Sequence, residues 1–294
     1  KMRRSAQRLE KTRYFSEVNP TVVPTGVPGE VDLKMGVKET ETGMVSVGFG
    51  YSIYDKLGVM ASITENNVFG RGYTLGLCGY TASREQYLEA SFVNPRVFDT
   101  YWGFSVNPYV IDEEWSYFYK RSAGVRLGLF HPIGEYTRLN LGYKFERYNL
   151  YHMSDNASSI IRAYKGKHWA STVSVGVTRD TTNKATFPTE GTRVSVNMQY
   201  GGPWTGGDDS FFKPILEAGF YYGLNDSNIL HVRGRVGAVY KSDPDKTVPV
   251  FERFWIGGIR SIRGYSYDDI SPRDPHTGET IGSDRMGYLN IEYI

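Results

Sequence analysis

The chain has 294 residues, of which 40% are apolar and 15% aromatic, with 33 glycines, 23 tyrosines and a formal net charge of +2. The near-zero charge gives no electrostatic case for nucleic-acid binding, and the single cysteine, Cys78, excludes an intramolecular disulfide or a cysteine-based zinc site. No run of about 18 apolar residues is present, so the sequence predicts no transmembrane helix. What remains is an all-β protein, either soluble or a membrane β-barrel.

Residues 1–41 form the first predicted unit. Apolar side chains in Arg4–Tyr14 are loosely spaced for one helical face. Two extended pieces, Glu17–Val23 and Val31–Val37, flank a turn-rich segment. Helix, strand, turn and strand make half of a small α/β module that is too small to hold a core alone. No signal peptide opens the chain, so we expect its start to be a boundary within a longer protein.

The second predicted unit, residues 42–294, alternates apolar and small or polar residues with a period of two. This pattern predicts about twelve strands of roughly 8–13 residues. The clearest runs are 45–52, 59–65, 73–78, 88–92, 102–106, 125–129, 139–146, 172–177, 193–200, 216–222, 230–238 and 288–293. Short turns such as 225–228 alternate with long polar loops at 151–167 and 241–284. Alternating short and long connections are typical of an outer-membrane barrel.

The composition of the two strand faces favours the barrel over a soluble β-sandwich. The non-apolar face is rich in Gly, Ser, Thr and Asn with interspersed charges, as a polar lumen requires. Aromatic residues gather near strand ends, where a membrane barrel carries its interfacial girdles. We therefore predict a transmembrane antiparallel β-barrel, with the β-sandwich as the alternative.

One stretch of the long segment 241–284 has unusual chemistry. Gly257 and Gly258 open it and permit backbone conformations that are closed to other residues. Arg263 follows as a planar donor that could hold a carboxylate, between Ile262 and Gly264-Tyr265. Loops this long inside a compact domain tend to be functional. The plain alternative is an exposed arginine in a flexible loop.

At this point the sequence resembles the BamA family of outer-membrane assembly factors, which join POTRA domains to a β-barrel. The resemblance rests on Asn66–Tyr73, on Asp180 followed by Phe187–Gly191, on Phe251–Phe254 and above all on Ile262–Tyr265. It covers essentially the whole chain. It implies that residues 1–41 are the C-terminal part of a POTRA domain and that residues 42–294 belong to a barrel of about sixteen strands. About four C-terminal strands would then be missing, and the arginine loop would fold back into the lumen.

The resemblance also implies a partner for Arg263. The matching acid is Glu292, and the strand alternation independently places Glu292 on the polar, lumenal face. The predicted loop-anchoring motif comprises Gly257, Gly258, Ile262, Arg263, Gly264 and Tyr265, with Glu292 as lumenal partner. Its role would be to clamp the loop to the barrel wall. Anchoring without any switching function is the alternative.

The first barrel strand is the second candidate site. It comprises Gly43, Val45, Val47, Gly48, Phe49, Gly50 and Tyr51. Its glycines leave little side-chain packing on the lumenal face, which weakens pairing and register. An edge that opens can pair with an incoming strand, so we predict a lateral gate here. Alternatively, small residues only leave room in a filled lumen.

The resulting prediction is an insertase, not an enzyme, that folds and inserts β-barrel proteins into the bacterial outer membrane. Expected partners are unfolded barrel clients, outer-membrane lipid and accessory lipoproteins, with no nucleic acid and no cofactor. The POTRA part would lie in the periplasm. Alternatives are a TamA-like assembly factor or a two-partner secretion transporter, and, less favoured, a porin.

Other chemistry finds little support in the sequence. The five histidines have no metal-ligand spacing, and no Gly-x-Ser-x-Gly elbow suggests a hydrolase. Asp268, Asp269, Asp274 and Glu279 lack a calcium-loop pattern, and we expect them to be solvated.

Overall fold

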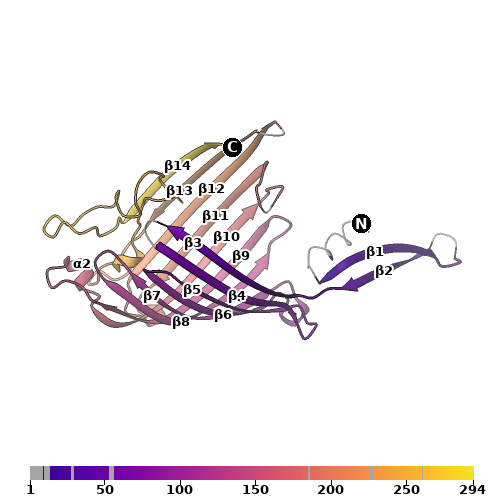
Figure 1. Cartoon of the computed structure of the whole chain (residues 1–294), viewed down its shortest axis with the longest axis horizontal. Helices are drawn as coiled ribbons and strands as arrows, with labels where there is room; N and C mark the ends of the chain where they lie inside the picture. Colours follow the sequence, from indigo (N-terminus) through magenta and orange to yellow (C-terminus); the bar gives the residue numbers. More distant parts are fainter. Residues whose placement is uncertain are drawn as a thin grey trace.

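The computed structural model describes Leu9 and residues 14–27, 30–52, 56–184, 186–225, 228–259 and 261–294. Two antiparallel sheets form the framework of this structure (Figure 1). No helix among the described residues has the length and apolar character needed to cross a membrane. The helix predicted for Arg4–Tyr14 lies almost entirely outside the described residues.

The smaller sheet is a hairpin of β1 (Phe15–Pro24) and β2 (Val31–Glu39). These strands contain the two extended pieces predicted from the sequence. The hairpin projects from one end of the larger sheet (Figure 1).

The larger sheet contains twelve strands, each paired antiparallel with its neighbours in sequence. They are β3 (Gly43–Ser52), β4 (Lys56–Val68), β5 (Tyr73–Thr81), β6 (Glu85–Asn94), β7 (Gly103–Glu114), β8 (Tyr119–Pro132), β9 (Thr137–Tyr151), β10 (Gly166–Asp180), β11 (Gly191–Gly201), β12 (Phe211–Asn225), β13 (Asn228–Ala238) and β14 (Arg285–Tyr293). This confirms the prediction, made from the period-two pattern, of about twelve barrel strands in this chain.

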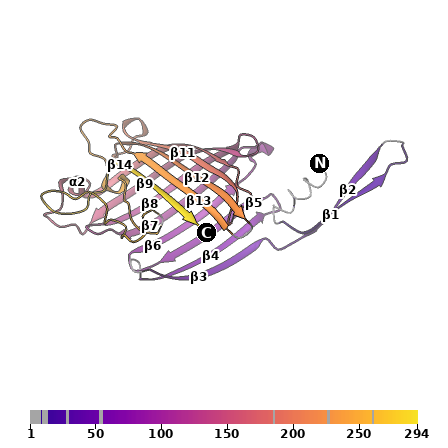
Figure 2. The same ribbon diagram turned by 90° about the horizontal axis from the view of Figure 1, so that it is seen from above.

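The sheet curls about an axis that crosses its strands obliquely (Figures 1 and 2). β3 and β14 stand at the two ends of the strand order, and no pairing joins them in the described part of the chain. The curved, up-and-down antiparallel arrangement is that of a β-barrel wall, as predicted.

The period-two pattern separates the two faces of this wall. On β10, Val173, Val175 and Val177 lie beside Tyr143, Leu141 and Leu139 of β9 in the strand register. All three valines are exposed, which gives an apolar outer surface. On the opposite face, Glu217 pairs in register with Arg235 and forms ion pairs with Arg233 and Arg235. An apolar outer face and a charged inner face suit a barrel in lipid.

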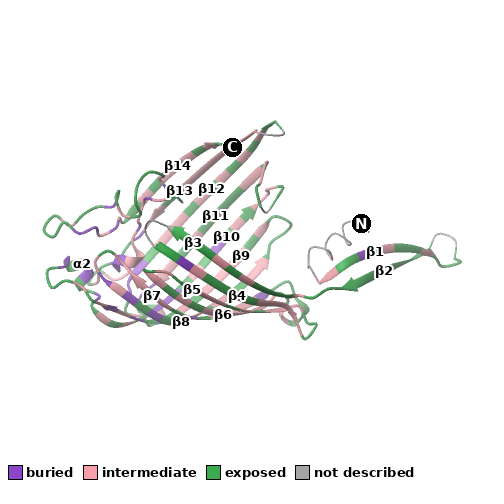
Figure 3. Cartoon of the chain, in the orientation of Figure 1, coloured by how far each residue is buried: buried purple, intermediate pink, exposed green. Residues whose placement is uncertain are grey.

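The long connections gather at the end of the sheet opposite the β1–β2 hairpin, and many of the buried residues lie there (Figures 1 and 3). Three short helices belong to these connections: α2 (Ser159–Arg162), η2 (Pro203–Thr205) and η3 (Val250–Glu252). A fourth, η1 (Val97–Asp99), lies between β6 and β7.

The 152–165 connection is less polar in its packing than the sequence suggested. Ala157, Ile161 and Tyr164 are buried in one cluster with Phe118 and Val250. These residues come from three different connections, so the loops form a shared apolar core at this end of the wall. The expectation of a merely polar loop was therefore wrong, because long-range packing decides which loop residues are buried.

Candidate functional site

The connection between β13 and β14, residues 239–284, returns along the wall and is anchored at its start by apolar packing. Phe254 is buried in a cluster with Phe211, Val239 and Val248. A methyl group at Gly237 would come 2.7 Å from the Phe254 ring, so glycine makes room for this side chain on β13. The motif Phe251–Phe254 noted in the sequence thus seats the first limb of the loop.

Gly257 and Gly258 turn the chain at the start of the predicted motif. Gly257 has φ +140° and Gly258 φ +85°, and a Cβ at Gly257 would overlap the carbonyl oxygen of Ser266. The Ser261 hydroxyl accepts from the Gly257 N–H at 2.9 Å and donates to the Gly257 carbonyl at 2.8 Å. The Gly258 N–H donates to the Tyr265 carbonyl at 2.7 Å. The segment therefore forms a closed turn that requires glycine at position 257.

Arg263 extends from this turn to the wall, where its guanidinium forms an ion pair with Glu292 of β14. The Arg263 side chain is 66% exposed and that of Glu292 22%. A second contact runs beside the first, because the Asn290 side-chain amide donates to the Ser261 carbonyl at 2.9 Å. Ile262 is half-buried, whereas Gly264 and Tyr265 are exposed. The structure thus brings Arg263 and Glu292 together and leaves Tyr265 at the surface of the loop.

Glu292 has a further neighbour on the wall. His231 of β13 lies opposite Glu292 in the strand register, and His231 Nδ1 is 3.2 Å from Glu292 Oε2. The His231 ring stacks on Tyr221 of β12, with centroids 4.2 Å apart and planes at 5°. Sequence reasoning missed His231, although the alternation along β13 places its side chain on the same inner face as Glu292.

The first strand of the wall, β3, is paired with β4 along one edge only. Val45, Val47, Phe49 and Tyr51 face outward and are 62–75% exposed. A Cβ at Gly48 would lie 3.7 Å from the Met60 methyl carbon, and a Cβ at Gly50 would meet nothing within 4 Å. Close packing therefore does not require glycine at positions 48 and 50. At Gly43 a Cβ would lie 3.2 Å from Glu65 Oε2, a tighter fit.

A second electrostatic anchor of the long loop was also missed by sequence reasoning. Glu252 lies 3.2 Å from the Lys213 ammonium nitrogen and 3.7 Å from that of Lys144. Burial opposes ionisation, but the two lysines outweigh it and lower the pKa of Glu252 below its usual value. Lys120 lies in the same cluster, with its ammonium 4.2 Å from the Phe251 ring centroid and 3.7 Å from Glu146. Glu252 and Phe251 therefore pack against a cluster of three lysines on the wall. This contact joins residues far apart in the sequence, so local periodicity does not reveal it.

The family of the chain follows from comparison with known proteins. Residues 67–294 match the Omp85 superfamily domain. The chain belongs to the Omp85 superfamily. The resemblance predicted from the motifs is confirmed by a curated relative of Nitratidesulfovibrio vulgaris, outer membrane protein assembly factor BamA, which is 45% identical over all 294 residues.

Other known proteins share less sequence with this chain. A BamA of Neisseria meningitidis is 27% identical over 93% of this chain. The crystal structure of BamA from Haemophilus ducreyi lacking POTRA domains 1-3 superposes with a TM-score of 0.82 and 21% identity, over 99% of this chain and 60% of that one. CdiB from Escherichia coli matches with a TM-score of 0.57 and 17% identity over 96% of this chain and 53% of that one. The chain spans 37% and 36% of the length of the two curated relatives.

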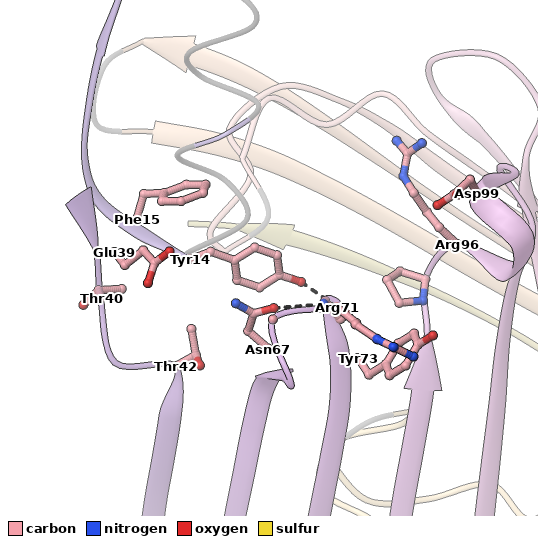
Figure 4. A pocket seen from close by; sticks show the side chains of 13 residues that line it. Tyr14, Phe15, Glu39, Thr40, Thr42, Asn67, Arg71, Tyr73, Arg96 and Asp99 are labelled. Atoms are coloured by element: carbon pink, nitrogen blue, oxygen red, sulfur yellow. Dashed lines mark hydrogen bonds between the residues drawn. The ribbon is translucent and has the colours of Figure 1, made fainter. Parts of the chain in front are cut away.

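In this Omp85 chain the hairpin meets the wall at a cleft of about 980 Å³ (Figure 4). The Tyr14 hydroxyl reaches the Gly72 carbonyl at 3.4 Å, and the Gly72 N–H donates to Asn67 Oδ1 at 2.8 Å. The Thr40 N–H donates to the Tyr14 carbonyl at 3.1 Å. The β4–β5 turn, part of the Asn66–Tyr73 motif, thereby fixes where the hairpin leaves the wall.

The acidic residues of the long loop serve the loop packing. Glu279 is buried and accepts from the Ser158 N–H at 2.5 Å, while Asp274 accepts from the Ser158 hydroxyl at 2.6 Å. These bonds tie the long loop to the connection that carries α2. The expectation that Glu279 is simply solvated was wrong, because the backbone donor at Ser158 is itself buried and needs an acceptor.

Proposed function

We propose that this chain is the barrel part of an outer-membrane assembly factor that folds and inserts β-barrel proteins. Membership of the Omp85 superfamily and 45% identity to a curated assembly factor support this function. The assignment needs no cofactor and no nucleotide. A client strand gains free energy by completing its hydrogen bonds and by moving apolar side chains into lipid.

The observation that carries the proposal is the contact between Arg263 and Glu292. It joins a loop that projects from one end of the wall to β14, the last strand in the wall order. A simple pore needs no such link. A barrel that exchanges strands at one edge needs such a link, because the rest of its wall must keep its shape during the exchange. We assign the Gly257–Tyr265 turn to this anchoring role.

The strand-exchanging edge in this proposal is β3. An edge strand that separates from its neighbour exposes backbone donors and acceptors, which are the groups that β-augmentation uses. Gly48 and Gly50 keep the strand weakly packed although a methyl group would fit at either position. Because a side chain would fit at both positions, steric crowding does not explain the two glycines. This supports the interpretation that they are present to keep the strand pairing weak.

The remaining parts of the proposal concern location and partners. The exposed apolar outer face supports a place in the bacterial outer membrane, with the β1–β2 hairpin as the C-terminal part of a POTRA domain on the periplasmic side. Clients would be unfolded β-barrel proteins. Accessory lipoproteins would bind the periplasmic part.

The Arg263→Ala variant tests the proposal. Because Arg263 is two-thirds exposed, we expect its loss to weaken loop docking by about 1 kcal/mol, which raises protease cleavage within 257–284 about fivefold. Client insertion into liposomes by the full-length protein should fall with it.

Arg121→Ala is the matched control, since Arg121 pairs with Asp112 at 2.5 Å with nearly the same exposures, 65% and 23%, and its contacts with Asp112 and the Tyr151 ring are to residues outside the loop. This variant should insert clients normally. Normal insertion by Arg263→Ala would contradict the anchoring role. Steady conductance without any client insertion by the unaltered protein would instead indicate a porin.

A further inference from the structure

The wall side of the loop contact is more buried than the loop side. Glu292 is mostly buried, whereas Arg263 is largely exposed. A long exposed arginine retains many rotamers, so the geometry of the ion pair depends on how firmly the carboxylate is held. The group that holds Glu292 therefore controls the anchor.

That group is His231. The two carboxylate oxygens of Glu292 are divided between two partners, with Oε1 facing Arg263 and Oε2 facing His231 Nδ1 at 3.2 Å. Since one oxygen is taken by the wall, the other is left pointing at the loop. The next arginines on the same face have acids of their own: Arg233 pairs with Glu217 at 2.8 Å, and Arg193 pairs with Asp180 at 2.7 Å.

His231 is itself fixed from the far side. Its ring lies flat on Tyr221, its register partner on β12, and only 13% of the side chain is exposed. Its Nε2 is buried and has no hydrogen-bond partner in the described structure. It faces a cavity of about 260 Å³ lined by Tyr221, Arg193 and Glu217 among others, and Gly219 leaves space beside it. Only Nδ1 makes a polar contact, so the imidazole acts on a single acid.

We propose that His231 is a positioning residue for the loop anchor. Tyr221, His231, Glu292 and Arg263 form one chain of contacts that runs from β12 through β13 and β14 to the loop. His231 orients the Glu292 carboxylate so that the loop arginine meets it in one geometry. This inference rests on the anchoring role proposed above and adds a residue outside the motif and outside its acid partner.

The test uses the full-length protein in lipid and measures the rate of protease cleavage within 257–284. His231→Phe keeps a flat ring on Tyr221 but removes the donor, and we expect cleavage to rise about threefold. His231→Asn places an amide donor near the position of Nδ1 and should recover most of the protection. If His231→Phe fails to fold, as judged by loss of the folded-barrel gel mobility, His231→Asn and His231→Leu give the same comparison of donor against no donor.

A double-mutant cycle decides whether His231 acts through the anchor. In the Arg263→Ala background, His231→Phe should add nothing, because the contact that it positions is already gone. If the cleavage rate of the double variant instead rises by the product of the two single-variant increases, His231 only supports the fold and the inference is overturned. Wild-type cleavage of His231→Phe would also overturn it.

His131→Phe is the control for ring replacement, since His131 of β8 packs on Trp102 with centroids 4.7 Å apart and is remote from the loop. Its loop cleavage should match that of the unaltered protein. Loop release in His231→Phe with undiminished client insertion would leave the positioning role standing. That outcome would count against the proposed function alone.

Discussion

At the scale of single residues, buried carboxylates separate into two electrostatic kinds in this wall. Glu252 is held ionised by two lysines, and its pKa is lowered. Asp209, in the connection before β12, is buried without a cation at contact distance, and burial raises its pKa to about 7. In the described part of the chain, its side chain accepts a hydrogen bond from the Tyr148 hydroxyl, 2.6 Å away.

Asp209 should therefore give the protein a stability that depends on pH. The folded state keeps the Asp209 proton up to about pH 7, whereas an unfolded Asp loses it near pH ~3.9. The folded state binds the extra proton between these values, so the free energy of unfolding falls as pH rises from about 4 to 7 and is flat above. Asp209→Asn should remove this pH dependence, which amounts to about 4 kcal/mol over the range, in denaturant titrations at several pH values. Asp155→Asn, at a side chain that is 98% exposed, should keep it, and an unchanged slope in Asp209→Asn would refute the assignment.

At the scale of the element, β3 combines an apolar outer face with an inner face that is poorly filled. Alanine at Gly48 and Gly50 meets no atom closer than 3.7 Å, so the added methyl groups should fit. They also restrict the unfolded backbone, which strengthens a strand by about 0.5–1 kcal/mol for each position.

The Gly48→Ala/Gly50→Ala variant should thus be slightly more stable and yet slower at client insertion. Heat-induced unfolding and insertion kinetics in liposomes measure the two effects. Gly79→Ala on β5, where a Cβ would lie 3.8 Å from Leu88, should stabilise without slowing insertion. Faster or unchanged insertion by the double variant would argue that the glycines have no role in strand exchange.

The elements themselves were largely predictable from the sequence, and the contacts between distant elements were not. Strand periodicity located β3 to β14 and put Glu292 on the inner face, because a period of two fixes which side chains share a face. The Glu252 anchor and the Ser158 bonds join residues far apart in sequence, and nothing local signals them. The Arg263 contact was reached only because its motif resembles a known family, not from spacing.

At the scale of the whole molecule, two attachments of the long loop to the wall differ in burial. At the first, Glu252 lies among lysines and Phe254 is buried in an apolar cluster. At the second, the ion pair of Arg263 with Glu292 and the hydrogen bond from Asn290 to Ser261 hold the loop to β14, and the Arg263 side chain is largely exposed. The first attachment should support the fold, and the second should be the one that opens.

Glu252→Gln tests this division of roles. Removing the charge takes the acid partner from Lys213, which lies 3.2 Å from Glu252, whereas Lys144 keeps Glu146 at 3.1 Å, so we expect a cost of about 3 kcal/mol. Thermal unfolding of the barrel should shift markedly, in contrast to Arg263→Ala. Glu114→Gln, which breaks the half-exposed pair with Arg84 at 3.9 Å, should change stability by less than about 1 kcal/mol. A small shift for Glu252→Gln would place the main support of the loop elsewhere.

The loop docking also has an optical consequence. Trp115 belongs to the β7–β8 connection and Trp255 to the long loop, and their rings meet edge to face with centroids 5.6 Å apart. Trp255 in turn stacks on Tyr267 at 5.9 Å. Chromophores packed this closely in fixed orientations produce near-ultraviolet circular dichroism, which disappears when the packing is lost. The chain thus has an intrinsic spectroscopic signal, and the part of it that comes from the Trp115–Trp255 contact should be lost when the two loops separate.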